Sequence, residues 1–341
     1  MKKRIIVLML SVFALCAAAQ NQQVEELIEK GVKQHDEGNY KAAINFYQQA
    51  LEKDKASVLA HYEIASSYYA MKEYDKAIEH CDAVIDADKD YADKAFVLKG
   101  TVYDVMGKPA EAVKVYKKGI KKFPGKYLLH YNLALTCYNQ KDDKQAERSL
   151  QDALTANPGH ASSHMLMAYV MSDKGSRVRT MLALYNFLLL EPNSKRSVKA
   201  WDMLNKLTRK GVSKSGENTI NISLDNSKDS EEFRAADLMV SMLEATRNLE
   251  ENEKKSDEQM FVENSESFFK ILGELEKKNR GFWWKFYVDF FNDLNNARHT
   301  EALCYYISQA AKKEAVNTWL DNNKTKIDSF GEWYKTYGRK F

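Results

Sequence analysis

Apolar residues recur at helical spacing along most of this chain. Residues 42–51 show the pattern, because Ala42, Ala43, Phe46, Tyr47, Ala50 and Leu51 recur at helical spacing. Similar amphipathic stretches continue to residue 211 and resume at residue 229, with Gly38, Gly107 and Gly175 at predicted turns between helices. The pattern predicts an all-α protein.

The amphipathic stretches repeat. A small residue in the middle of every other predicted helix recurs with steps of 34, 35, 34 and 34 residues, at Gly31, Ala65, Gly100, Ala134 and Ala168. The helices between them carry a second series with the same steps, at Ala43, Ala77, Ala112, Ala146 and Thr180. A larger residue follows each of these four positions later, at Tyr47, Cys81, Tyr116, Leu150 and Leu184. Five helical pairs of this size cannot bury their apolar faces alone, so they must stack on one another.

This repeat resembles the tetratricopeptide repeat (TPR) family. That family carries large-x2-Leu-Gly-x2-Tyr in its first helix, Ala-x3-Phe in its second and a closing proline. The third unit fits best, with Phe96, Gly100, Tyr103, Ala112, Tyr116 and Pro124. The fifth departs most, because Thr180 replaces the alanine. The resemblance covers about residues 24–192 and implies a right-handed α-solenoid of five helix–turn–helix repeats.

The rest of the chain divides into three segments. A capping helix begins at Ser194 and ends at Gly211, so the predicted solenoid covers 24–211. Residues 212–228 are polar and predict a linker, in which Ile220 and Ile222 alternate with polar residues as in a short strand. Residues 229–341 predict a C-terminal helical module, with capping pairs at Asp229–Glu232 and Ser256–Gln259 and last helices near 299–312 and 313–337. This module matches no family pattern.

The first 19 residues have the order of a signal peptide. Lys2, Lys3 and Arg4 precede an apolar run from Ile5 to Cys16, and small residues follow it. The pattern is typical of bacterial export, so we expect a periplasmic or outer-membrane-associated protein. Cys16 leaves open a lipid anchor instead of simple cleavage, although the residue before it is the bulky Leu15.

Composition narrows the possible partners. The chain is 44% hydrophobic and 29% charged, as expected of a folded, helix-rich protein. Its formal charge of +3 comes from the three basic residues of the signal, so the remainder is neutral and has no general attraction for nucleic acid. Beyond the signal, no segment approaches the length of a transmembrane helix.

The candidate binding surface is the concave face that the resemblance assigns to the first helix of each repeat. The residues projected onto it are five tyrosines and four apolar residues: Tyr62, Tyr69, Tyr131, Tyr138, Tyr169, Leu59, Leu128, Leu135 and Met165. Tyrosine combines a large contact area with a polar tip and suits a partner-binding groove. The alternative is that some of these tyrosines pack between helices. The residues that would clamp a C-terminal carboxylate are absent from the first unit, which has Ile28 and Val32 there.

The aromatic run and the histidines have structural explanations. The aromatic run from Phe282 to Phe291 is apolar nearly all round its helix and predicts the centre of the C-terminal core. His61, His130 and His164 share one repeat position and predict packing, not a metal site. No zinc, phosphate-loop or nucleophile motif occurs, so we expect no cofactor and no catalytic residue.

We therefore interpret the chain as a non-enzymatic scaffold or adaptor of the cell envelope that binds a partner peptide or helix. Two alternatives remain open. One is a glycan- or peptide-ligand-binding envelope protein, and the other is an enzyme with its active site in residues 229–341.

Overall fold

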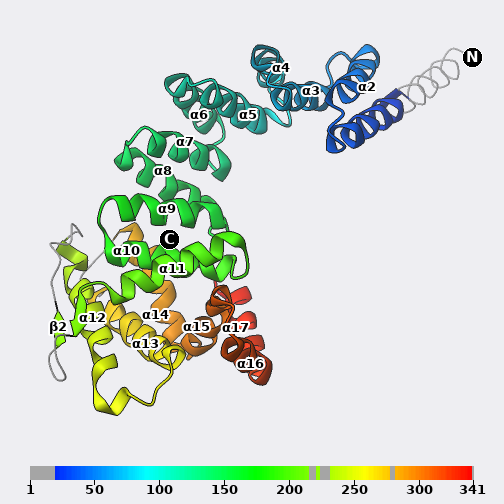
Figure 1. Cartoon of the computed structure of the whole chain (residues 1–341). Helices are drawn as coiled ribbons and strands as arrows, with labels where there is room; N and C mark the ends of the chain where they lie inside the picture. Colours follow the sequence, from blue (N-terminus) through cyan, green and yellow to red (C-terminus); the bar gives the residue numbers. More distant parts are fainter. Residues whose placement is uncertain (1–19, 215–219, 223–230, 277–280, 340–341) are drawn as a thin grey trace, which may run out of the picture. The chain divides into compact units, whose positions relative to one another are not determined.

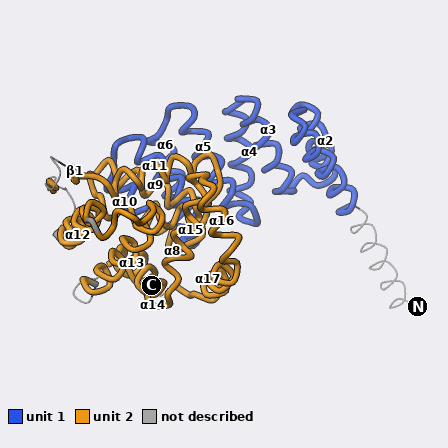
Figure 2. Tube along the Cα trace, turned by 60° about the horizontal axis from the view of Figure 1, so that its bottom comes forward, with its two compact units in different colours: residues 1–149 blue, residues 150–341 orange. Residues whose placement is uncertain are grey.

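A computed structural model describes residues 20–214, 220–222, 231–276 and 281–339. The predicted signal segment with Cys16 lies outside the described residues, as does Asp229 of the first predicted capping pair. The chain forms two compact units, Met1–Ser149 and Leu150–Phe341 (Figure 2), and each is described by itself.

The first unit is a succession of paired helices (Figure 1). Residues 20–36 are helical. They are followed by α2 (Tyr40–Lys53), α3 (Val58–Ala70), α4 (Tyr74–Ala87), α5 (Ala92–Val105), α6 (Pro109–Lys122) and α7 (Tyr127–Asn139), and α8 (Asp143–Ala156) runs on into the second unit. Helices α2 to α7 each pack against the next, and α3, α5 and α7 also contact in succession. This is the sequential antiparallel packing predicted from the repeat.

The two periodic series meet in the core of each repeat. The ring of Tyr47 covers Gly31, where an added Cβ would lie 2.3 Å from the ring, and Tyr116 covers Gly100 at 2.2 Å. Both tyrosines are fully buried. The repeats with a smaller second residue, such as Cys81 or Leu150, carry alanine in the first series instead. Small and large residues are therefore matched within each unit, as close packing requires.

The turn inside each repeat uses the left-handed backbone region at one repeat position. It falls on Gly38, Lys72, Gly107, Lys141 and Gly175, with φ between 62° and 82°. The three glycines are the predicted turn residues. The two lysines adopt a conformation that costs a non-glycine residue about 1–2 kcal/mol, so the repeat geometry dictates the turn and the local sequence does not.

After the last residues of α8, the second unit contains the fifth repeat, α9 (Ala161–Asp173) and α10 (Arg177–Leu190), and the capping helix α11 (Lys195–Arg209). Ser194 caps α11, as predicted, by accepting from the backbone amides of Arg196 and Ser197. Val212–Lys214 (β1) and Ile220–Ile222 (β2) then pair antiparallel, with Val212 opposite Ile222. The predicted linker thus contains a short hairpin.

The remaining helices of this unit are short, apart from α13. They are η1 (Glu231–Phe233), α12 (Arg234–Ala245), η2 (Thr246–Asn248), η3 (Glu250–Asn252), α13 (Asp257–Glu276), the π-helical η4 (Trp283–Val288), α14 (Asp289–Asn296), α15 (Thr300–Ile307), η5 (Ser308–Ala311), α16 (Glu314–Asn322) and α17 (Lys324–Thr336). Ser256 and Gln259 form the predicted capping box at the start of α13. The helix predicted over 313–337 is divided at Asn323, whose side chain donates to the carbonyl of Trp319 and competes with helix continuation.

Helix α10 lies at the centre of the second unit. Twelve of its residues are buried, because α9, α11, α12, η4 and α15 all pack against it. The Tyr185 ring contacts those of Phe261, Phe269 and Phe291 at 5.9, 5.2 and 5.7 Å. The predicted aromatic core is confirmed, since Trp283, Trp284, Phe286, Tyr287, Phe290 and Phe291 are all buried. Burial all round explains why α10 lacks an amphipathic pattern.

A buried arginine joins three helices of this unit. Arg177, at the start of α10, donates to the carbonyls of Leu207 and Thr208 at 2.7 and 3.1 Å, where α11 ends. It also donates to Ser241 Oγ at 2.7 Å and lies 3.3 Å from the Asp237 carboxylate, both on α12. The guanidinium therefore caps the C-terminus of α11, whose last carbonyls lack helical partners.

The sequence-based boundaries at 24–211, 212–228 and 229–341 stay a prediction. The second compact unit contains the fifth repeat and α11 together with the C-terminal helices.

Candidate functional site

The first helices of successive repeats carry the predicted tyrosines. In the first unit, Leu59, Tyr62 and Tyr69 lie on α3, and Leu128, Tyr131, Leu135 and Tyr138 lie on α7. All seven keep part of their surface accessible, and Leu128 is 38% exposed. Met165 and Tyr169 lie on α9 in the second unit, where Met165 is buried and Tyr169 half-buried.

A cavity of about 480 Å³ lies between these first helices in the first unit. Tyr62 of α3 and Leu128 of α7 line it from opposite sides, and Val97 and Leu98 of α5 lie between them. The structure therefore brings two predicted residues, Tyr62 and Leu128, to one cavity. The other five predicted residues of this unit do not line it.

The middle repeat contributes lining residues that the sequence analysis missed. These are Lys94, Val97 and Thr101, which occupy the repeat positions of Leu128, Tyr131 and Leu135 one unit earlier. The 34-residue step alone would have found them. This unit carries lysine, valine and threonine at these positions and no tyrosine, so the tyrosine pattern does not indicate it.

Asp104 lies at the repeat position of Tyr138, and its carboxylate makes hydrogen bonds within the fold. Its carboxylate accepts from Thr136 Oγ1 at 2.5 Å and from Tyr116 Oη at 3.2 Å. Burial raises the pKa of Asp104, although both hydrogen bonds oppose the rise. Asp104 therefore joins α5 to α6 and α7.

The rim of the cavity is charged. Lys126 pairs with Asp93 at 3.0 Å. Lys94 is exposed, and its ammonium lies 4.5 Å from the centre of the Tyr91 ring, which in turn lies 5.5 Å from the Tyr62 ring. Among the residues that line the cavity, the pairing of Asp93 with Lys126 leaves one positive charge in excess at Lys94.

Burial sets the protonation of the groups nearby. It raises the pKa of Tyr62, and the neighbouring Glu63 carboxylate raises it further, so the phenol remains a neutral hydrogen-bond donor. Burial also raises the pKa of Glu63, while Lys94 lowers it. The cavity thus combines an apolar floor, a phenol and an ammonium, a combination suited to binding.

The histidines and cysteines behave as packing residues. His130 and His164 are buried, and each lies within hydrogen-bonding distance of the carbonyl of a proline six residues earlier. His61 is half-buried, with its Nδ1 3.0 Å from that of His80. Cys81, Cys137 and Cys304 are buried free thiols. Over the described ranges, no group of three or more His, Cys, Asp or Glu is placed to hold a metal ion.

Within the same ranges, no helix is both long and apolar enough to span a bilayer.

The fold and the row of first helices define a class. Residues 34–95 and 106–169 match the family described as Tetratricopeptide repeat, so this part of the chain consists of TPR repeats. Arrays of this class use their concave surfaces to bind proteins or peptides.

Particular relatives are similar over parts of the chain. The Small glutamine-rich tetratricopeptide repeat-containing protein 2 of Saccharomyces cerevisiae is 29% identical over 101 residues, which are 30% of this chain and 29% of the relative. The match thus spans less than a third of that relative's length. Among solved structures, pilF of Pseudomonas aeruginosa has 18% identity and a TM-score of 0.48, covering 56% of this chain and 90% of its own. YrrB, described as a TPR protein with an unusual peptide-binding site, has 18% identity and a TM-score of 0.41, covering 54% of this chain and 98% of its own.

Proposed function

We propose that this chain is a non-enzymatic scaffold that binds a partner peptide or helix across α3, α5 and α7. The observation that carries the proposal is the cavity between these helices, lined by Tyr62, Val97 and Leu128. A cavity lined by partly exposed apolar and phenolic side chains is a surface that can take the apolar face of an amphipathic peptide.

The charge at the rim specifies the partner further. An apolar side chain of the partner would enter the cavity, and an acidic residue beside it would meet Lys94. Cation–π contact with Tyr91 holds Lys94 at the rim. The partner motif that fits is therefore an apolar anchor with an acidic neighbour.

The test is selection of displayed random peptides on the full chain. We expect enrichment of an apolar residue next to Asp or Glu, and loss of binding in the double variant Tyr62→Ala with Leu128→Ala. The matched control is Tyr40→Ala with Val105→Ala, which removes one tyrosine and one aliphatic residue outside the cavity. Equal recovery of peptides on the two double variants would refute the proposal that the partner binds across α3, α5 and α7.

A charge-reversal variant tests the acidic neighbour separately. Lys94→Glu should change the selected motif from acidic to basic next to the apolar anchor. If the preference for an acidic residue persists in Lys94→Glu, Lys94 does not recognise the acidic residue of the partner.

We also propose that the scaffold acts in the bacterial cell envelope, at the periplasm or outer membrane. The support is the order of basic residues, apolar run and small residues in the first 19 positions. The intact mass of the exported protein tests it. A chain that begins at Gln20 supports cleavage, acyl chains on Cys16 support a lipid anchor, and full-length protein in the cytoplasm overturns export.

A further inference from the structure

The second unit contains a cavity unrelated to the row of first helices. It measures about 300 Å³ and is lined by residues of α10, α11, α12 and α13, with η2, η5 and Lys313 at its edge. This volume lies at the lower end of the range for small-ligand sites. It suits a ligand of about the size of one large amino acid.

The inner wall is apolar and largely aromatic. Met181 and Tyr185 come from α10, Trp201 from α11, and Phe261 and Phe268 from α13. The Phe261 ring is stacked on Tyr185 at 5.9 Å and meets the Trp201 ring edge-on at 5.1 Å. A planar or branched apolar body would extend this aromatic packing.

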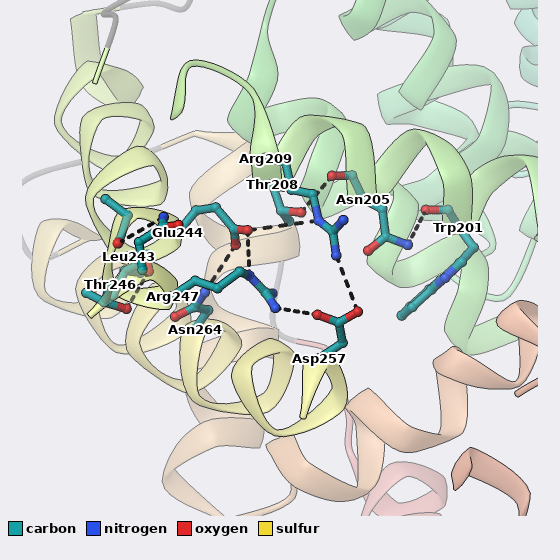
Figure 3. Close-up of polar contacts among 12 residues, drawn as sticks. Trp201, Asn205, Thr208, Arg209, Leu243, Glu244, Thr246, Arg247, Asp257 and Asn264 are labelled. Atoms are coloured by element: carbon teal, nitrogen blue, oxygen red, sulfur yellow. Dashed lines mark hydrogen bonds and ion pairs between the residues drawn. The ribbon is translucent and has the colours of Figure 1, made fainter. Parts of the chain in front are cut away.

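The mouth carries three cations and three carboxylates, most of which are fully engaged. Arg247 binds Glu244 Oε1 at 2.8 Å and Asp257 Oδ1 at 2.5 Å, and Lys313 binds Glu258 Oε1 at 2.7 Å. These three contacts satisfy every carboxylate at the mouth (Figure 3 shows those of Arg247). Two of the three cations are satisfied as well.

Arg209 is the exception. Its guanidinium reaches from α11 toward α12 and α13 (Figure 3), but its distances to Glu244 and Asp257 are 3.9 and 3.7 Å. Both are too long for hydrogen bonds, and among the described residues its side chain makes no shorter polar contact. The side chain is 55% exposed. Arg247 and Lys313 make the short contacts to the three carboxylates, so the cationic N–H donors left over among the lining residues belong to Arg209.

We propose that this cavity binds a small apolar monocarboxylate, with the carboxylate on Arg209 and the apolar body against Trp201 and Phe261. The planar guanidinium matches a carboxylate with two parallel hydrogen bonds. The three cations of the mouth balance its three carboxylates, so a bound monocarboxylate would leave only one negative charge in excess. A dianionic phosphate would add charge beside the carboxylates of Glu244 and Asp257. The site lies in a different unit from the peptide surface and does not rest on the function proposed above.

Calorimetric titration of the full chain tests the proposal, with N-acetyl-L-phenylalanine as the probe and its amide as the uncharged match. We expect the acid to bind at least tenfold more tightly than the amide. Arg209→Gln should lower the affinity for the acid at least tenfold and leave that for the amide unchanged. Lys206→Gln, which removes a charge from an exposed position of the same helix, should leave both unchanged. Thermal unfolding checks that both variants are folded.

Three outcomes would overturn the site: no binding of either probe at millimolar concentration, equal affinity for acid and amide, or full acid affinity in Arg209→Gln. A pentapeptide ending in phenylalanine distinguishes the source of the carboxylate. Tighter binding of the peptide than of the N-acetyl acid assigns the site to a peptide C-terminus. Weaker binding of the peptide assigns it to free small acids.

Discussion

His164 and Tyr287 are 123 residues apart in sequence, and His164 Nδ1 lies 2.9 Å from Tyr287 Oη. His164 Nε2 lies 2.9 Å from the carbonyl of Pro158, which can only accept, so Nε2 carries the proton. Nδ1 must then accept from the Tyr287 hydroxyl. Both side chains are fully buried, and the bond ties the fifth repeat to the π-helical turn η4.

Removal of this hydroxyl should destabilise the second unit. Tyr287→Phe leaves Nδ1 of His164 buried and without its donor, which costs about 1–3 kcal/mol of unfolding free energy. Urea unfolding measures the difference. Tyr305→Phe is the control, because its ring is stacked on Trp319 and no hydrogen bond from its hydroxyl occurs within the described residues. Equal losses in the two variants would contradict the role of the His164–Tyr287 bond.

The same histidine predicts acid sensitivity. Burial lowers the pKa of His164 to about 3, well below the 6.5 of an exposed imidazole. Between these values the unfolded chain binds a proton that the folded chain does not, so stability falls as the pH drops below about 6.5, by up to about 1.4 kcal/mol per pH unit. His164→Gln should be less stable than the wild type at pH 7, and the gap should narrow toward pH 4. A gap that stays constant across this range would show that His164 titrates normally.

The pairing of glycine and tyrosine inside a repeat predicts a rescue. Gly100→Ala places a methyl group against the buried Tyr116 ring and should cost about 1–3 kcal/mol. Adding Tyr116→Leu recreates the Ala134–Leu150 combination of the next repeat and should recover part of the loss. Chemical unfolding of the four variants of this cycle gives the coupling energy. Additive effects would mean that the two positions do not constrain each other.

The lysine turns predict a gain in stability. Lys72 has a φ of 62°, and its side chain is exposed. Lys72→Gly removes left-handed strain and adds freedom to the unfolded chain, so we expect a net gain of about 0.5–1 kcal/mol. The reverse change, Gly107→Ala, meets no atom within 4 Å and should lose about 1 kcal/mol through the backbone alone. Thermal unfolding of both variants checks the opposite signs.

Loss of Arg177 should be the most damaging of these changes. Arg177→Met strands the largely buried Asp237 carboxylate and the last carbonyls of α11, and we expect a loss of about 3–5 kcal/mol. Asp237→Asn keeps a polar partner for the arginine and should cost less. Denaturant unfolding ranks the two, and a smaller loss for Arg177→Met would place the stabilisation elsewhere.

Much of the fold could be predicted from the sequence because the same helix-pair pattern recurs in five repeats. The spacing of Gly31, Gly100 and their equivalents located the helix pairs, and Ser194 and Ser256 marked helix starts that the structure confirms. The break at Asn323 was missed because it depends on one side chain competing for a backbone carbonyl within an otherwise periodic stretch.

The sites were harder to predict, since they depend on contacts between distant segments. Tyr62 and Leu128 were found by their repeat position, whereas Lys94 was overlooked because its type differs from theirs. Arg177 follows a turn and suggests an exposed helix start, and only the fold of the second unit buries it. The cavity at Arg209 is lined by residues of four helices that lie between positions 181 and 313, and no local sequence pattern predicts it.

The burial of α10 also limits how such an array can change in evolution. Each repeat of such an array stacks on its neighbours, so an added unit needs an accessible helix pair on which to stack. Around the fifth repeat that surface is already covered by α12, η4 and α15. New units could therefore be inserted among the first four repeats, where each pair meets another pair. A unit added after the fifth repeat would have to displace the helices that already cover α10.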